Sequence, residues 1–76
     1  MDDQPQEFKL YAIYDHPEDY PYGFVVREWI VTGGGTMAGE GYTAATLEEA
    51  RGLLPAGVAL ISGRDPQEPT IVETWA

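Results

Sequence analysis

Phe24-Val25-Val26-Arg27-Glu28-Trp29-Ile30-Val31 is the stretch that decides the fold. Apart from its two charges it is β-branched or aromatic, and it contains neither glycine nor proline, so it predicts an extended strand. Because side chains alternate between the two faces of a strand, apolar residues occupy both faces here. We therefore expect a central strand of a sheet, with Arg27 interrupting one face and Glu28 the other.

Further strands are expected on both sides of this stretch. Residues 8–14 alternate between apolar and polar side chains and predict a first strand, and the prolines and glycine of residues 15–23 predict a loop after it. Residues 58–61 and 70–75 predict two more strands, and Glu73 between its neighbours indicates a wet face or an edge for the last one. Residues 36–43 contain two glycines and fit either a short strand or a flexible hairpin arm.

A helix start is visible at Thr46, which can cap a helix, with Glu49 at the spacing of a capping box. Apolar residues then recur at helical spacing until Pro55 and Gly57 stop the helix after about two turns. The predicted order is β-β-(β)-α-β-β, an α+β class with an antiparallel sheet of four to five strands and one short helix packed across it. We expect one domain over residues 1–76, with residues 1–7 as a flexible acidic arm.

The charge balance is the strongest compositional feature, because 13 acidic residues face four basic ones and give a net charge of −9. Such a surface repels nucleic acid and membrane lipids that are anionic, and it attracts basic protein surfaces. A second explanation stays open, since acidic residues also keep a small protein soluble without any binding role.

Catalytic and metal-binding patterns are missing from the sequence. There is no cysteine, and Ser62 and His16 are the only serine and histidine, without a nucleophile motif around either. Gly33 and Gly35 fit a dinucleotide fingerprint but Ala38 takes its third glycine position, and the acids around His16 lack a calcium-loop layout. We expect no enzyme activity, no cofactor and no metal.

The amino terminus is acidic and lacks the apolar segment of a secretory signal. No apolar run approaches the ~20 residues that cross a membrane. These features predict a cytoplasmic protein without a membrane partner.

Candidate contact residues lie in the loop before the strand and at the helix start. Large rings on a proline-containing loop often anchor protein contacts, although they can also fold back over a small core. If the acids of the loop and the helix start converge on one face, that face could imitate nucleic-acid phosphates; the alternative is a dispersed, solvated surface. The predicted partner-binding residues are Asp15, Glu18, Asp19, Tyr20, Tyr22, Glu48 and Glu49. A small core and an exposed strand edge also predict a homodimer through the edge of the sheet.

Four segments carry a resemblance to known proteins: residues 11–17 (YAIYDHP), residues 24–29 (FVVREW), residues 46–57 (TLEEAR, then Pro55 and Gly57) and residues 69–75 (P-x-IVE-x-W). They resemble a family of short, acidic, uncharacterised proteobacterial proteins that has no catalytic motif. The chain is also similar to phage anti-CRISPR proteins, in particular inhibitors of type I-C systems. That resemblance implies binding to a CRISPR surveillance complex and denial of its target DNA, without saying which residues touch the complex.

The leading hypothesis is therefore a non-enzymatic inhibitor whose acidic, nucleic-acid-mimicking surface binds a basic groove of the surveillance complex. The competing hypothesis is a bacterial protein-interaction module with another partner, acidic for solubility only. Neither hypothesis involves direct binding of nucleic acid.

Overall fold

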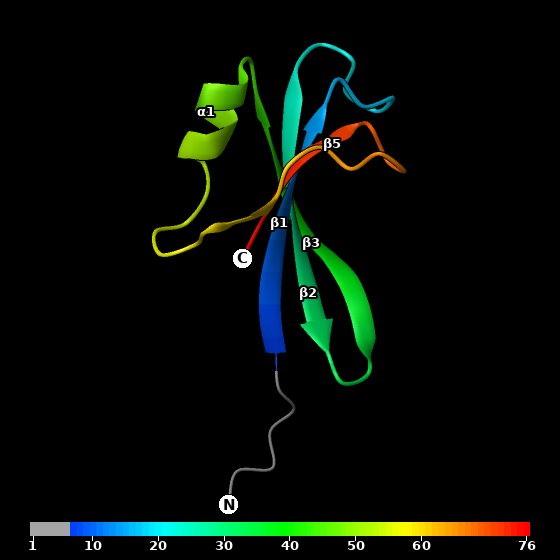
Figure 1. Cartoon of the computed structure of the whole chain (residues 1–76), viewed down its shortest axis with the longest axis vertical. Coiled ribbons are helices and arrows are strands. Elements are labelled where there is room, and N and C mark those ends of the chain that lie inside the picture. The colour runs from blue at the N-terminus through cyan, green and yellow to red at the C-terminus, as the bar shows by residue number, and fades with distance from the viewer. Residues whose placement is uncertain (1–6) are drawn as a thin grey trace, which may run out of the picture.

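The computed structural model describes residues 7–76, which form one sheet and one helix (Figure 1). The elements are β1 (Glu7–Asp15), β2 (Phe24–Thr32), β3 (Gly35–Ala44), α1 (Leu47–Gly52), β4 (Leu60–Ser62) and β5 (Ile71–Trp75). Each pair of neighbouring strands is antiparallel, in the order β3-β2-β1-β5-β4. The predicted α+β class, an antiparallel sheet with one short helix, is confirmed, and the sheet has five strands. The predicted arm loses Glu7 to β1, and its other residues, 1–6, lie outside the described residues.

β1 occupies the middle position of the sheet, and β2 lies beside it. β1 pairs with β2 from Glu7 opposite Thr32 to Asp15 opposite Phe24, and it pairs with β5 on its other side. β2 is nevertheless an interior strand, because β3 covers its second edge. Its apolar residues on both faces reflect this interior position.

β3 settles the stretch that the sequence left open, and two glycines explain how a strand forms there. A Cβ built at Gly39 would collide with the carboxylate of Glu28, and a Cβ at Gly41 would lie 3.5 Å from Nη2 of Arg27. The missing side chain at Gly39 therefore gives the Glu28 carboxylate its room, whereas a Cβ at Gly41 would make only an ordinary van der Waals contact with Arg27. The register between β2 and β3 shifts between Arg27 and Trp29, next to this point.

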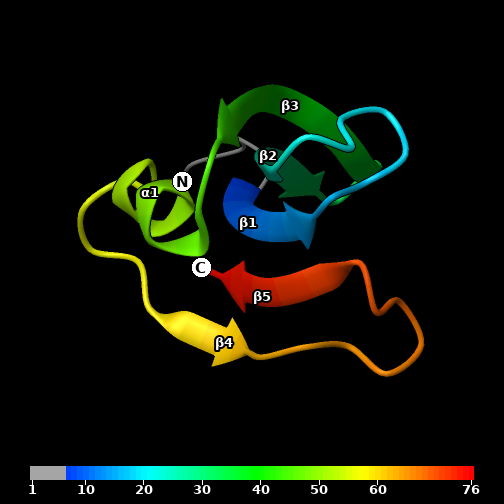
Figure 2. The same cartoon turned by 90° about the horizontal axis from the view of Figure 1, so that it is seen from above.

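The single helix lies on one side of the sheet, and the loop of residues 16–23 lies on the other (Figure 2). Thr46 caps α1 as predicted, since its Oγ1 accepts a hydrogen bond from the Glu49 amide at 3.1 Å. The Glu49 carboxylate reaches back to the amide of Ala45 at 3.4 Å, one residue before the cap. The helix and the sheet share the main hydrophobic core cluster, which consists of Ile13, Val26, Ala44, Ala50 and Val72.

Two strand predictions need correction at the carboxyl-terminal side. The strand expected at residues 58–61 is the short β4, whose three residues are exposed at the edge of the sheet. The wet face or edge expected for Glu73 is wrong, because β5 lies between β1 and β4 and Glu73 is only 7% exposed.

Glu73 is buried because three donors satisfy its carboxylate. Nε of Arg51 donates to Oε1 at 3.0 Å, Nη2 of Arg51 contacts Oε2, and Nε1 of Trp75 donates to Oε1 at 3.0 Å. The hydrogen bonds from Arg51 lower the pKa of Glu73 against the opposing effect of its burial, and the indole of Trp75 adds to the lowering. This ion pair ties α1 to β5.

We predict that Glu73→Gln destabilises the fold by about 1 kcal/mol at pH 7, a modest value because the Arg51 side chain is half exposed. The folded-state pKa of Glu73 lies below the unfolded-state value, so its contribution is complete above the unfolded-state pKa and disappears as pH falls through the folded-state pKa. Urea unfolding of both proteins from neutral to acidic pH should show the stability gap closing on acidification. The exposed Glu48→Gln is the matched control, and a Glu73→Gln gap that persists unchanged in acid would contradict this role.

Candidate functional site

Three segments meet at one end of the sheet, the upper end in Figure 1: the loop of residues 16–23, the start of α1 and the loop of residues 63–70. The backbone amide of Asp15 donates to the carbonyl of Thr70 at 2.7 Å. Gly23 packs so closely on Ala44, just before the helix cap, that a Cβ would lie 2.5 Å from the Ala44 carbonyl oxygen. We call the acids of this region the acidic end; they are Asp15, Glu18, Asp19, Glu48, Glu49, Asp65 and Glu68.

The predicted contact residues all lie at this end, but they do not share one face. The loop that carries Glu18 and Asp19 lies on one side of the sheet, and the helix start that carries Glu48 and Glu49 lies on the other (Figure 2). The structure therefore brings the two predicted groups to the same end of the molecule, on opposite sides of the sheet. A partner that contacts both must cap the end rather than lie on a face.

Two of the predicted acids already have cationic partners. Asp15 Oδ2 lies 3.7 Å from Nη2 of Arg64, and Asp19 Oδ2 lies 3.9 Å from Nη2 of Arg27. Asp15 also contacts the imidazole of His16, whose backbone is left-handed with φ 48°. Arg64 is distant from Asp15 in the sequence, and the Asp19–Arg27 pair depends on how the loop folds against β2, so no local pattern signals either pair.

The remaining bases are also paired, Lys9 with Glu28 and Arg51 with Glu73. All four bases of the chain are thus each paired with one acid. Within residues 7–76, the acids without an ion pair are Glu7, Glu18, Glu40, Glu48, Glu49, Asp65 and Glu68. The excess negative charge of the acidic end therefore comes from Glu18, the two helix-start glutamates and the 63–70 loop.

Tyr20 and Tyr22 behave differently from each other. Their rings meet edge to face with centroids 5.8 Å apart, which holds the pair together on the loop. Tyr22 is 82% exposed, whereas Tyr20 is partly buried and lies 3.5 Å from the Cβ position of Gly23. Tyr22 is thus free to contact a partner, and Tyr20 supports the loop beneath it.

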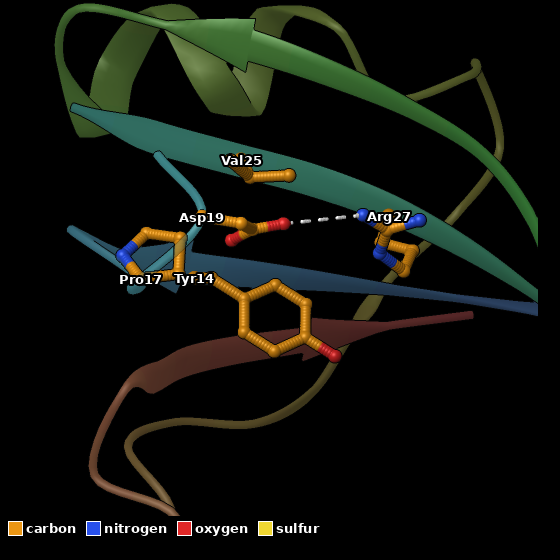
Figure 3. A pocket seen from close by; sticks show the side chains of 5 residues that line it. All are labelled: Tyr14, Pro17, Asp19, Val25 and Arg27. Atoms are coloured by element: carbon orange, nitrogen blue, oxygen red, sulfur yellow. Dashed lines mark ion pairs between the residues drawn. The ribbon is translucent and has the colours of Figure 1, made fainter. Parts of the chain in front are cut away.

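A shallow hollow of about 160 Å³ lies beside this loop, on the sheet face away from the helix, and is lined by Tyr14, Pro17, Asp19, Val25 and Arg27 (Figure 3). The Arg27–Asp19 ion pair spans it. The Tyr14 hydroxyl, which accepts a hydrogen bond from Nε1 of Trp29 at 3.3 Å, lies at its border. The hollow is smaller than the ~300 Å³ at which pockets for small molecules usually begin. Its lining has no nucleophile with a neighbouring base.

Ser62 and His16 form no hydrogen bond with each other in the described part of the chain, where Ser62 lies on the edge strand β4. Over residues 7–76 no group of three or more histidine, cysteine or acidic side chains is arranged to hold a metal ion. None of the helices described in this range has the length and apolar character needed to cross a membrane.

Comparison of the chain with protein-family models, with curated proteins and with solved structures found no match.

Proposed function

We propose that this protein is a non-enzymatic binding domain whose acidic end occupies a basic surface of another protein. The observation that carries the proposal is the distribution of charge: each base is paired with one acid, and five carboxylates at the acidic end have no ion pair among the described residues. Those carboxylates belong to Glu18, Glu48, Glu49, Asp65 and Glu68. A concentration of one charge sign at one end of a small body speeds its association with a surface of opposite sign.

Tyr22 supplies the second element that a binding surface needs. Charged contacts at a wet surface mainly speed and orient association, whereas large aromatic side chains contribute most of the affinity. Tyr22 is 82% exposed and stands on the same loop as Glu18. An exposed ring next to unpaired carboxylates supports a contact surface, because solubility alone requires charges and no exposed ring.

The specific partner that we propose is the surveillance complex of a type I-C CRISPR system, which the resemblance of the sequence implies. An effector complex of this kind holds nucleic acid in a positively charged channel. A domain with a crowded negative end could occupy such a channel and prevent target DNA from binding. The competing proposal is an interaction module for a different protein, with an acidic surface that serves solubility only.

We predict that Glu18→Lys and Glu48→Lys each weaken inhibition of target-DNA binding by the purified surveillance complex about tenfold. Neither residue has an ion pair among the described residues, so each change removes a free carboxylate and adds a repelling charge. The matched control is Glu7→Lys, which alters the net charge equally but lies at the opposite end of β1, where Glu7 pairs with Thr32.

Inhibition by the wild-type protein should also fall steeply as salt rises from about 0.05 M to about 0.5 M, because exposed charges are screened. Equal losses in all three variants would mean that net charge alone acts. Inhibition that is insensitive to salt and to every charge reversal would favour the solubility explanation. No inhibition at any concentration would exclude the CRISPR partner.

We also propose that the chain forms a homodimer through β3. This strand is ten residues long, stands at the edge of the sheet and leaves one side of its backbone without a strand partner among the described residues. Long exposed edges of this kind add strands from a second copy. The other edge, β4, is only three residues long and offers far less backbone.

We predict that light scattering at high concentration reports twice the chain mass of 8.4 kDa. Hydrogen exchange should slow for the amides of β3 as concentration rises, while the amides of β4 stay unaffected as an internal control. A constant mass of one chain, with no change of exchange in β3, would contradict the dimer.

A further inference from the structure

A second hollow, of about 190 Å³, lies between the carboxyl-terminal end of α1 and the sheet. It is separate from the acidic end and from the hollow beside Arg27, and none of the contact residues predicted from the sequence lines it. Its walls are Tyr11, Val26, Glu28, Tyr42, Leu53 and Pro55. Two tyrosine rings and one carboxylate therefore meet over an apolar floor, since Val26 belongs to the core.

Glu28 is held in this hollow by its neighbours. Its side chain is 19% exposed, and its Oε2 lies 3.4 Å from the hydroxyl of Tyr11 and 3.6 Å from Nζ of Lys9. Gly39 on the adjacent strand leaves the space that the carboxylate occupies, because a Cβ there would collide with it. A carboxylate with so little exposure interacts more strongly with a cation than one in open water.

A second carboxylate, that of Glu40, is hydrogen-bonded to Tyr42 of the lining. The hydroxyl of Tyr42 donates to Oε2 of Glu40 at 2.7 Å. This hydrogen bond is the main reason why the pKa of Tyr42 is raised, and the charges of Glu40 and Glu28 raise it further. The negative potential around Tyr42 thus comes from two glutamates, whereas Lys9 is the one base paired with either of them within the described residues.

We propose that this hollow receives an arginine side chain of the basic partner, an inference that rests on the proposed function and names the side chain that would be recognised. A guanidinium is planar, stacks on aromatic rings and donates two parallel hydrogen bonds to a carboxylate. Tyr11 and Tyr42 supply the rings, and Glu28 supplies the acceptor. At about 190 Å³ the hollow suits one side chain rather than a small-molecule ligand, for which pockets usually begin near ~300 Å³.

Lys9 is the internal competitor of the incoming arginine. Its side chain is 48% exposed and makes a single long contact with Glu28, so it can swing into solvent when a better donor arrives. Removing Lys9 should therefore strengthen arginine binding, and neutralising Glu28 should weaken it. Opposite effects of two neighbouring substitutions are hard to produce by a general loss of structure.

The test uses N-acetyl-arginine amide as the probe and N-acetyl-citrulline amide as its uncharged counterpart, each titrated into the full chain while NMR follows the aromatic protons. We expect saturable shifts at Tyr11 and Tyr42 with the arginine probe, and none with citrulline. Glu28→Gln should weaken the arginine probe about tenfold, and Lys9→Gln should tighten it about threefold. Glu7→Gln is the matched control and should leave its binding unchanged, because Glu7 is exposed, has no ion pair among the described residues and lines neither hollow.

Equal shifts with citrulline, or saturable shifts confined to Tyr20 and Tyr22, would overturn the arginine site. N-acetyl-lysine amide binding as tightly as the arginine probe would overturn the preference for a guanidinium. If Glu28→Gln fails to fold, Lys9→Gln and Tyr42→Ala decide, because the site requires them to shift the affinity in opposite directions. Failure of the probe while Glu18→Lys still weakens partner binding removes the hollow and leaves the proposed function intact; probe binding without any effect of Glu18→Lys removes the acidic end instead.

Discussion

Ala50 of the only helix in the described residues packs on Ile13 and Val26 of the sheet, and the rest of the structure depends on that contact. Ala50 and Ile13 are completely buried and Val26 is 1% exposed. A chain of 76 residues buries only about 60% of its unfolded surface, so little else can compensate for a loss here. A helix of six residues is unstable alone, which is why its cap and its ion pair to the sheet matter.

The charges of β2 give each side of the sheet its chemical character. Arg27 faces the side away from the helix and borders the first hollow with Asp19, and Glu28 faces the helix side and borders the second hollow with the two tyrosines. β3 accommodates both, with Gly39 against Glu28 and Gly41 against Arg27. The two charged residues of an otherwise apolar strand thus each line one of the two hollows.

The sequence predicted the features that depend on local pattern. The strand at residues 24–31 and the helix start at Thr46 follow from alternation, composition and capping, and both are present. The sequence did not decide whether residues 36–43 form a strand, because glycine usually disfavours one. Gly39 fits a strand here because the side chain of Glu28 occupies the space beside it.

Features that depend on contacts between distant residues could not be read from the sequence. The position of Glu73 in the sequence indicated a wet face or an edge. Arg51, 22 residues away in the chain, instead pairs with Glu73 and allows it to be buried. The candidate site shows the same limit. The acids at its end were visible in the sequence. The pairing of Asp19 with Arg27 depends on how the loop folds against β2, and Tyr11 and Tyr42 line one hollow because of the strand register.

Five carboxylates without an ion pair among the described residues gather where the loops of residues 16–23 and 63–70 meet the start of α1. The most direct measurement is paramagnetic relaxation of the amide protons by a cationic nitroxide, compared with a neutral nitroxide of the same size. We expect the cationic probe to enhance relaxation at the acidic end well above the neutral probe, and above its own effect at the β2–β3 turn. Equal enhancement by both probes, or an even distribution over the molecule, would contradict it.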